Sequence, residues 1–302
     1  MDLLIRLESW GAKMAIGLFV ECFINGLQMG MLIVLMACGL VLVLGITKIF
    51  NFAHGEFYMF GAYITFYFSY SLFKFNYGIS LFFSALGAGL LGWLSYLAVF
   101  QRIRGSLLLC AAATIGMSMA FRQGALLGFG TTEKGMPSVF PGLINIAGYT
   151  FPREKIVAIA LGLLALLLLF YVLKMTKVGK AMRAVSLDAE TASLQGVNVN
   201  WIYGLTVAAG CALAGVAGGI MAPILAVTPH MGHRSLLLVL IVLLVGGLES
   251  LLGAILAGIG IGMVMSFGFQ FFGGISEMIV FIIIGLFLIS KPGGILGRVV
   301  EV

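Results

Sequence analysis

A short polar stretch, residues 51–56 (NFAHGE), interrupts a largely apolar region and carries the side chains best suited to chemistry. It brings together an amide, an imidazole, a glycine and a carboxylate, from Asn51, His54, Gly55 and Glu56. Ionisable groups inside a membrane are costly and often mark a transport pathway, and unwound backbone at that depth needs protein or a water-lined cavity around it. The stretch therefore predicts a broken helix beside a translocation pathway or, alternatively, a wet turn between two helices.

A second polar stretch, residues 246–250 (GGLES), allows the same two interpretations. Gly246 and Gly247 let the chain leave a helix, and Glu249 supplies a carboxylate that faces either the interior or an exposed loop. His230 and His233 lie in a segment that we expect to be a short outer loop. Because two histidines are too few to hold a metal, we assign no metal site and no cofactor.

The third polar region, residues 174–200, lies between two strongly apolar segments. It opens with basic residues at intervals of three, Lys174, Lys177, Lys180 and Arg183. A short helix is predicted in its second half, with Asp188 as cap, Glu190 in the first turn and Gly196 at the end. Such a helix is either a contact point for a soluble partner or part of a solvated connecting loop.

The amino-acid composition indicates which kind of secondary structure surrounds these polar stretches. Hydrophobic residues make up 62% of the 302 residues and charged residues only 9%, against about 25% charged residues in an average globular domain. Several uncharged runs approach the ~20 residues that cross a bilayer as a helix. The sequence therefore predicts an all-α, multi-span membrane protein, and its net charge of +6 is a topology signal rather than a nucleic-acid footprint.

We expect eight or nine spans in a single transmembrane domain over residues 1–302. The segment 235–245 is short enough to be re-entrant, and residues 1–14 suggest an amphipathic interfacial helix. The other expected spans are 22–46, 57–73, 79–100, 107–129, 156–173, 201–227, 251–272 and 275–289. Positive charge predicts a cytoplasmic location for Arg102 and Arg104, for 174–200 and for Lys291 and Arg298, and an external one for 131–153.

Each half of the chain, roughly 1–155 and 156–302, has a long glycine-bearing span followed by a polar break. Transporters often contain two such halves with broken helices near the midplane. Four GxxxG pairs predict close helix packing, at Gly26/Gly30, Gly124/Gly128, Gly215/Gly219 and Gly258/Gly262. Arg122, inside an expected span, is predicted to snorkel to the interface.

Signatures of catalysis are missing from the sequence. It has no GxxxxGK[ST], HExxH or GxSxG motif, so we expect neither an ATPase nor another enzyme activity in this chain. The cysteines Cys22, Cys38, Cys110 and Cys211 lie in or beside apolar segments without a CxxC pair, which predicts small buried hydrophobic residues.

Four segments together resemble the LivH-type permeases of branched-chain amino acid ABC importers. They are 25–63, which contains NFAHGE, then 179–223, 246–258 (GGLESLLGAILAG) and 291–298 (KPGGILGR). The resemblance covers nearly the whole chain. Two positions depart from the family pattern: Ala189 stands where many members have proline, and residues 249–251 replace a glycine- and proline-bearing version.

The resemblance implies a permease that imports branched-chain or other amino acids across the bacterial inner membrane. It also implies a second related permease, two cytoplasmic ATP-binding subunits that drive transport, and an external substrate-binding protein. Residues 174–200 would be the ATPase-coupling loop, with Arg183, Asp188, Glu190 and Gly196, and the two breaks would be broken helices. The sequence leaves open a permease for urea or short amides, or a self-sufficient ion-coupled carrier that uses Glu56 and Glu249. An intramembrane enzyme is disfavoured because converging catalytic groups are missing.

Overall fold

The computed structural model describes residues 2–146, 149–291 and 293–296. The helices are α1 (Asp2–Thr47), α2 (His54–Phe66), α3 (Tyr77–Ser95), α4 (Gln101–Ile103), α5 (Leu107–Phe129), α6 (Arg153–Met175), α7 (Lys177–Leu187), α8 (Ala189–Leu194), α9 (Val199–Met221), α10 (Met231–Gly246), α11 (Leu251–Phe272) and α12 (Ser276–Ser290). π-Helical turns extend α2 and α3, at Tyr67–Ser71 and Tyr96–Phe100, and a 3₁₀ turn, Gly273–Ile275, precedes α12. Strands β1 (Leu143–Ile146) and β2 (Tyr149–Pro152) form an antiparallel hairpin that pairs Leu143 with Pro152.

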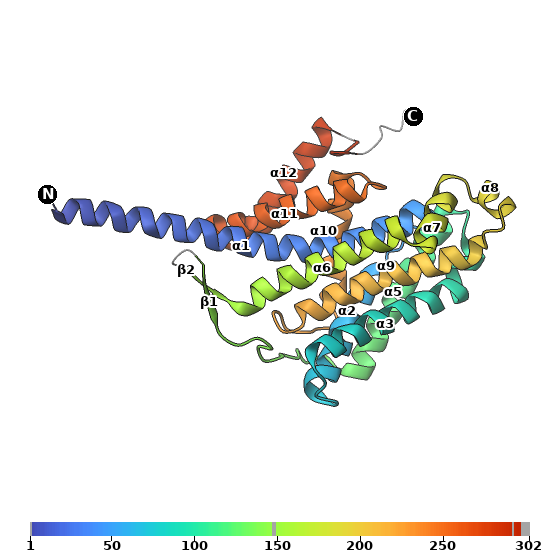
Figure 1. Cartoon of the computed structure of the whole chain (residues 1–302), viewed down its shortest axis with the longest axis horizontal. Helices are drawn as coiled ribbons and strands as arrows, with labels where there is room; N and C mark the ends of the chain where they lie inside the picture. Colours follow the sequence, from blue (N-terminus) through green and yellow to red (C-terminus); the bar gives the residue numbers. More distant parts are fainter. Residues whose placement is uncertain (1, 147–148, 292, 297–302) are drawn as a thin grey trace.

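The helices form an elongated bundle around α1 and α9 (Figure 1). The long helix α1 packs against α9 and α11, and α9 packs in turn against α2 and α3. The β1–β2 hairpin lies at one end of the bundle, and α7 and α8 lie at the other. The turn at Arg104 and Gly105 shares a cavity with α8, so two of the basic regions that the sequence places on one side of the membrane do lie at one end.

Side-chain caps explain where many of these helices begin. Asn76, Ser106, Asn198 and Ser250 each accept a hydrogen bond from a backbone N–H in the first turn of α3, α5, α9 and α11, respectively. Such a bond satisfies one of the N–H groups that a helix start leaves free. The starts of α2 and α10 have no side-chain cap, and both contribute to the site described below.

Comparison with the expected spans gives partial agreement. The bounds of α5 and α11 match the predicted 107–129 and 251–272, whereas α10 begins at Met231, inside the segment predicted to be a loop. The predicted external region 131–153 contains the unexpected hairpin. Within the described residues, five helices are long and apolar enough to cross a membrane, so the expected eight or nine spans are not confirmed. Side chains of residues 1–15 and Arg298 lie outside the described set, so the amphipathic face at 1–14 stays a prediction.

Close backbone contact between α1 and α11 explains two of the four GxxxG pairs. A Cβ atom at Gly30 would lie 2.9 Å from the Cα of Ile259, and one at Gly262 would lie 2.4 Å from the Cα of Gly30. Only glycine, which has no Cβ atom, permits the two helix backbones to approach this closely. Ser266 in α11 also donates a hydrogen bond to the Cys22 carbonyl at 2.8 Å. By contrast, Gly124 and Gly128 on α5 have open space where a Cβ atom would be, so no described residue packs closely against this pair.

Candidate functional site

The first polar interruption is buried. Helix α1 ends at Thr47, and the chain passes through Asn51, whose side-chain oxygen accepts a hydrogen bond from the Ala53 N–H at 3.0 Å, before α2 begins. Asn51 and His54 are 0% exposed, and Glu56 is 1% exposed. This burial disagrees with a wet turn, and the assignment of the stretch to a broken helix beside a translocation pathway stays a prediction.

The start of α2 packs directly against the start of α10. A Cβ atom at Gly55 would lie 2.2 Å from the Gly232 carbonyl oxygen, and one at Gly232 would lie 2.5 Å from the Gly55 carbonyl oxygen. These distances leave no room for a side chain at either position. Two uncapped helix N-termini thus meet at Gly55 and Gly232. Their partial positive charge favours a carboxylate close by, which Glu56 provides.

Glu56 connects α2 to the middle of α5. Its Oε1 atom accepts a hydrogen bond from Ser118 Oγ at 2.8 Å and lies 3.6 Å from Nη2 of Arg122. Arg122 also donates to Ser118 Oγ at 3.4 Å. The predicted snorkelling of Arg122 is therefore wrong, because a buried carboxylate within reach attracts the guanidinium toward the bundle.

Several polar atoms of this cluster have no hydrogen-bond partner. Among the described residues, they include Nδ2 of Asn51, Nδ1 of His54 and Oε2 of Glu56, whereas Nε2 of His54 lies 3.2 Å from the Met36 carbonyl oxygen. Buried polar atoms normally find partners, and each exception needs a reason. A bound water, a ligand or a partner chain would be needed to satisfy these atoms, so the break is a candidate for a functional region.

The second interruption has a different environment. Gly246 ends α10, Gly247 adopts a positive φ of 103°, and Ser250 caps α11. Glu249 lies outside the core and accepts a hydrogen bond from Lys48 Nζ at 2.6 Å, with both side chains 59% exposed. The Ile295 N–H donates to the Val245 carbonyl at 2.7 Å, so the chain after α12 covers the end of α10. Of the two interpretations of Glu249, the exposed loop acid is the one observed.

The region 174–200 folds into two helices joined at Asp188. The predicted short helix is α8, and the Asp188 carboxylate accepts hydrogen bonds from the Glu190 and Thr191 N–H groups at 2.9 and 3.1 Å. The Thr191 hydroxyl and these N–H groups hold the pKa of Asp188 below its usual range, so the cap is ionised at neutral pH. Gly196 follows α8 with φ +83°. Helix α7 was not predicted, and its Arg183 donates to the Leu173 carbonyl at the end of α6.

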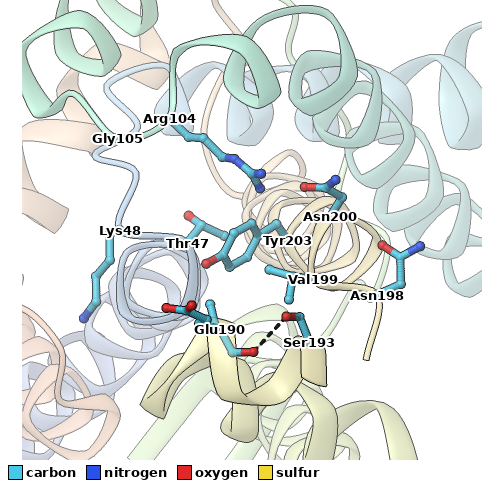
Figure 2. Close-up of a pocket in the computed structure, with 11 residues that line it drawn as sticks. Thr47, Lys48, Arg104, Gly105, Glu190, Ser193, Asn198, Val199, Asn200 and Tyr203 are labelled. Carbon is cyan, nitrogen blue, oxygen red and sulfur yellow. Dashed lines mark hydrogen bonds between the residues drawn. The ribbon is translucent and has the colours of Figure 1, made fainter. Parts of the chain in front are cut away.

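A cavity of about 670 Å³ separates α8 from the end of the bundle. Figure 2 shows Glu190 and Ser193 of α8 on one side, with Tyr203 and Arg104 facing them. The Arg104 guanidinium lies 5.4 Å from the centre of the Tyr203 ring. The other lining residues are Thr47, Lys48, Gly105, Ala189, Asn198, Val199 and Asn200. Ala192, in the middle of α8, is 5% exposed and packs into the hydrophobic core, so α8 stays in contact with the bundle beside this cavity.

The structure groups the predicted residues into separate regions. Residues 51–56 meet the start of α10 at Gly232, and Glu249 forms an ion pair with Lys48, which lies between α1 and the first interruption. Ser118 and Arg122 were missed as partners of Glu56, although the spacing Thr114, Ser118, Arg122 places them on one helix face. No group of three or more His, Cys, Asp or Glu residues suited to a metal occurs in the described part of the chain. The four cysteines are buried, as predicted.

Five helices that are long and apolar enough to cross a bilayer, with a charged cluster buried at a helix break, are typical of a multi-pass membrane protein. Residues 22–290 match the family described as the permease component of the branched-chain amino acid transport system. The chain belongs to this family, which consists of transport permeases rather than enzymes.

Individual relatives carry the same description. LivH, the high-affinity branched-chain amino acid transport system permease protein of Salmonella typhimurium, is 29% identical over 93% of this chain and 96% of its own length. BraD of Pseudomonas aeruginosa, which has the same description, is 29% identical with the same coverage. A probable LivH of Methanocaldococcus jannaschii is 27% identical over 88% of this chain and 89% of its own. No solved structure matches the chain significantly.

Proposed function

We propose that this chain is a membrane-spanning permease subunit of an ABC importer that carries branched-chain amino acids across the bacterial inner membrane. The family match over residues 22–290 carries the proposal. The working complex would contain a second related permease, two cytoplasmic ATP-binding subunits and an external binding protein. The chain itself would supply the pathway, and the partners would supply ATP hydrolysis and substrate capture.

The proposed orientation places α7, α8 and the C-terminal segment in the cytoplasm and the β1–β2 hairpin outside. Basic residues at the α8 end of the bundle support it, because positive charge beside spans marks the cytoplasmic side. Two exposed leucines flank α8 there, Leu187 at 88% and Leu194 at 81% exposure. Apolar side chains exposed at a water-facing end are suited to contact a soluble protein. We therefore propose that residues 174–200 contact an ATPase subunit.

Two reciprocal glycine contacts support the proposed division into two halves. Helices α1 and α9 meet at Gly39 and Gly210, where each Cβ atom would lie 2.6 Å from the other residue's carbonyl oxygen. Helices α2 and α10 meet in the same way at Gly55 and Gly232. In this interpretation, α1 and α2 correspond to α9 and α10, and their crossing points form the centre around which the halves move.

Purification of the tagged chain from its native membrane, followed by reconstitution, tests the proposal. We expect the second permease and the ATP-binding proteins to co-purify, and proteoliposomes of this complex to import leucine, isoleucine or valine with ATP and the binding protein. Uptake of urea or amides in place of these amino acids would reassign the substrate. Transport by the chain alone, without ATPase partners, would overturn the proposal in favour of an ion-coupled carrier.

The coupling assignment predicts that Glu190→Lys and Gly196→Pro uncouple ATP hydrolysis from transport while the chain still inserts. The first substitution reverses a charge on α8, and the second fixes φ near −65° where the backbone needs +83°. Both variants should lose at least about tenfold in transport per ATP hydrolysed, as a loss of about 1.4 kcal/mol in coupling would give. Glu133→Lys, an exposed charge reversal outside the coupling region, is the matched control. Transport equal to that of the unmutated complex in both variants would refute the assignment.

A further inference from the structure

One face of α3 carries a continuous row of exposed apolar side chains. Its members recur every three or four residues along α3 and the π-helical turn after it, which places them on one side of the helix. They are Ile79, Phe82, Leu86, Leu90, Leu94 and Leu97, each between 44% and 64% exposed. Because Tyr77–Ile103 is long and apolar enough to cross a membrane, this row is suited to contact lipid acyl chains.

The packing of α3 favours a lipid contact at this row over a contact with another helix. Helices that pair inside a bilayer place small residues in the contact, because these let the backbones approach. Helix α3 uses its small residues against α9, where a Cβ atom at Gly89 would lie 3.3 Å from the Ala208 carbonyl oxygen. A Cβ atom at Gly92 would lie 2.7 Å from that of Cys211. The outward row contains only large side chains, as expected of a face that meets lipid.

Two tryptophans mark the level at which this row ends. Trp93 of α3 and Trp201 of α9 lie edge to face, with ring centroids 6.4 Å apart, and Trp201 is 48% exposed. Tryptophan rings concentrate where the hydrocarbon of a bilayer meets the headgroups. Asn200 and Tyr203, on either side of Trp201, line the cavity of about 670 Å³ beside α8. The cavity therefore lies at the level where lipid headgroups are expected.

This cavity presents opposite charges on facing walls. Arg104 lies at the end of the helical run that carries the apolar row, and its guanidinium is 5.4 Å from the centre of the Tyr203 ring. Glu190 of α8 faces it across the cavity (Figure 2). Neither side chain forms an ion pair with another described residue. The two walls are thus suited to a ligand that carries an anionic group and a cationic group together.

We propose that the cavity beside α8 holds the headgroup of a phospholipid with a primary ammonium group, while an acyl chain lies along the apolar row of α3. The Arg104 guanidinium donates hydrogen bonds to the phosphate, and the Glu190 carboxylate accepts them from the ammonium. A headgroup without a cation leaves Glu190 unpaired, and a quaternary ammonium has no N–H to donate. The site therefore selects phosphatidylethanolamine over phosphatidylglycerol and phosphatidylcholine. The inference goes beyond the proposed function, because it requires only that the chain spans a membrane.

Photo-crosslinking tests which lipid occupies the site. The protein purified from its native membrane is reconstituted in nanodiscs with a trace of phosphatidylethanolamine that carries a diazirine in one acyl chain, and mass spectrometry identifies the labelled peptides. Leu164 and Leu168 on α6, at 61–62% exposure, report unselective lipid contact as an internal reference. Unlabelled phosphatidylethanolamine should reduce labelling of α3 about fivefold more effectively than phosphatidylcholine or phosphatidylglycerol, as one partly exposed ion pair would give. Labelling of α6 should fall equally with all three lipids.

Substitutions at the two charges test how the headgroup is held. Glu190→Gln should make phosphatidylethanolamine and phosphatidylglycerol compete almost equally at α3, because the acceptor for the ammonium is lost. Arg104→Gln should weaken competition by both lipids about fivefold, because both carry the phosphate that the guanidinium binds. Arg102→Gln is the matched control, an exposed arginine two positions away that is not among the lining residues, and it should behave like the unmutated protein. Unchanged labelling of α6 verifies that each variant is folded and inserted.

Any of three results would overturn the proposal. Absent labelling of α3, or equal competition there by the three lipids, would show that no headgroup is recognised. Equal losses in Arg102→Gln and Arg104→Gln would show a general attraction to basic surface rather than a site. Selective loss of α3 labelling with millimolar leucine would assign the cavity to a free amino acid. Because labelling requires no transport, its failure leaves the proposed function intact, and a failure to transport leucine leaves the lipid test decisive.

Discussion

The two polar interruptions of the apolar helices place their carboxylates in opposite environments. Glu56 is 1% exposed and contacts Ser118 and Arg122 of another helix, whereas Glu249 is 59% exposed and forms an ion pair with Lys48. At the first break the uncapped start of α2 packs against the uncapped start of α10, whereas the second break connects α10, which ends at Gly246, to the capped start of α11. Burying the Glu56 carboxylate costs desolvation free energy, which is typical of a functional position. The second break has the features of an ordinary junction between two helices.

The largest expected effect comes from filling the contact between α2 and α10. Gly55→Val should lower the free energy of unfolding by more than about 3 kcal/mol, because its Cβ atom would lie 2.2 Å from a backbone oxygen that cannot move aside cheaply. Unfolding in mixed detergent micelles measures the effect. Gly45→Ala, which has open space at the corresponding point in α1, is the control and should be nearly neutral. Equal stability of the two variants would show that the first break is not tightly packed.

The two carboxylates provide the most direct test of the contrast. Glu56→Ala should cost about 2–3 kcal/mol, because Arg122 loses its partner in a largely buried position. Glu249→Ala should cost less than about 1 kcal/mol, because its ion pair with Lys48 is mostly exposed. The same unfolding measurement gives both values. If the two variants lose equal stability, the difference in burial between Glu56 and Glu249 does not translate into a difference in their contributions to stability.

The smallest predicted effect concerns the cap of the second break. Ser250→Ala removes the hydrogen bond that the Gly253 N–H donates to the Ser250 hydroxyl at 3.0 Å, and it should cost about 1 kcal/mol. Hydrogen exchange should become faster only in the first turn of α11. Ser290→Ala, whose hydroxyl bonds to the carbonyl of Phe287 at the exposed end of α12, is the comparison. Loss of protection throughout α10 and α11 would indicate that the junction is not locally independent.

Local signals explain which parts of the fold the sequence could predict. The bounds of α5 and α11 were predictable because a capping serine precedes each apolar run and a glycine follows it. The short helix α8 was predictable from Asp188 and Gly196 for the same reason. The start of α10 was missed because its first turn contains Gly232, His233 and Arg234, which have the composition of a loop, and no side chain caps it.

The candidate site was less predictable because its decisive contacts join distant segments. Residues 51–56 and 246–250 have similar local composition, yet only Glu56 has a serine and an arginine facing it, 62 and 66 positions further along the chain. Burial of a carboxylate depends on such partners and on the helices that bring them together. The contact between Gly55 and Gly232 also depends on the tertiary arrangement, because either glycine alone is compatible with a simple turn.

The crossing of α1 and α11 has a consequence for how the chain is made. Ser266 bonds to the carbonyl of Cys22 across 244 residues, so the glycine face of α1 leaves the ribosome long before its partner does. At about 5–20 residues per second, the interval is roughly 12 to 50 s. During that time, the Gly26–Gly30 surface must be covered by lipid or by a membrane insertion factor. Substitutions in α1 that leave the folded structure unchanged can therefore still lower the amount of folded protein that is made, because they affect α1 before α11 has been synthesised.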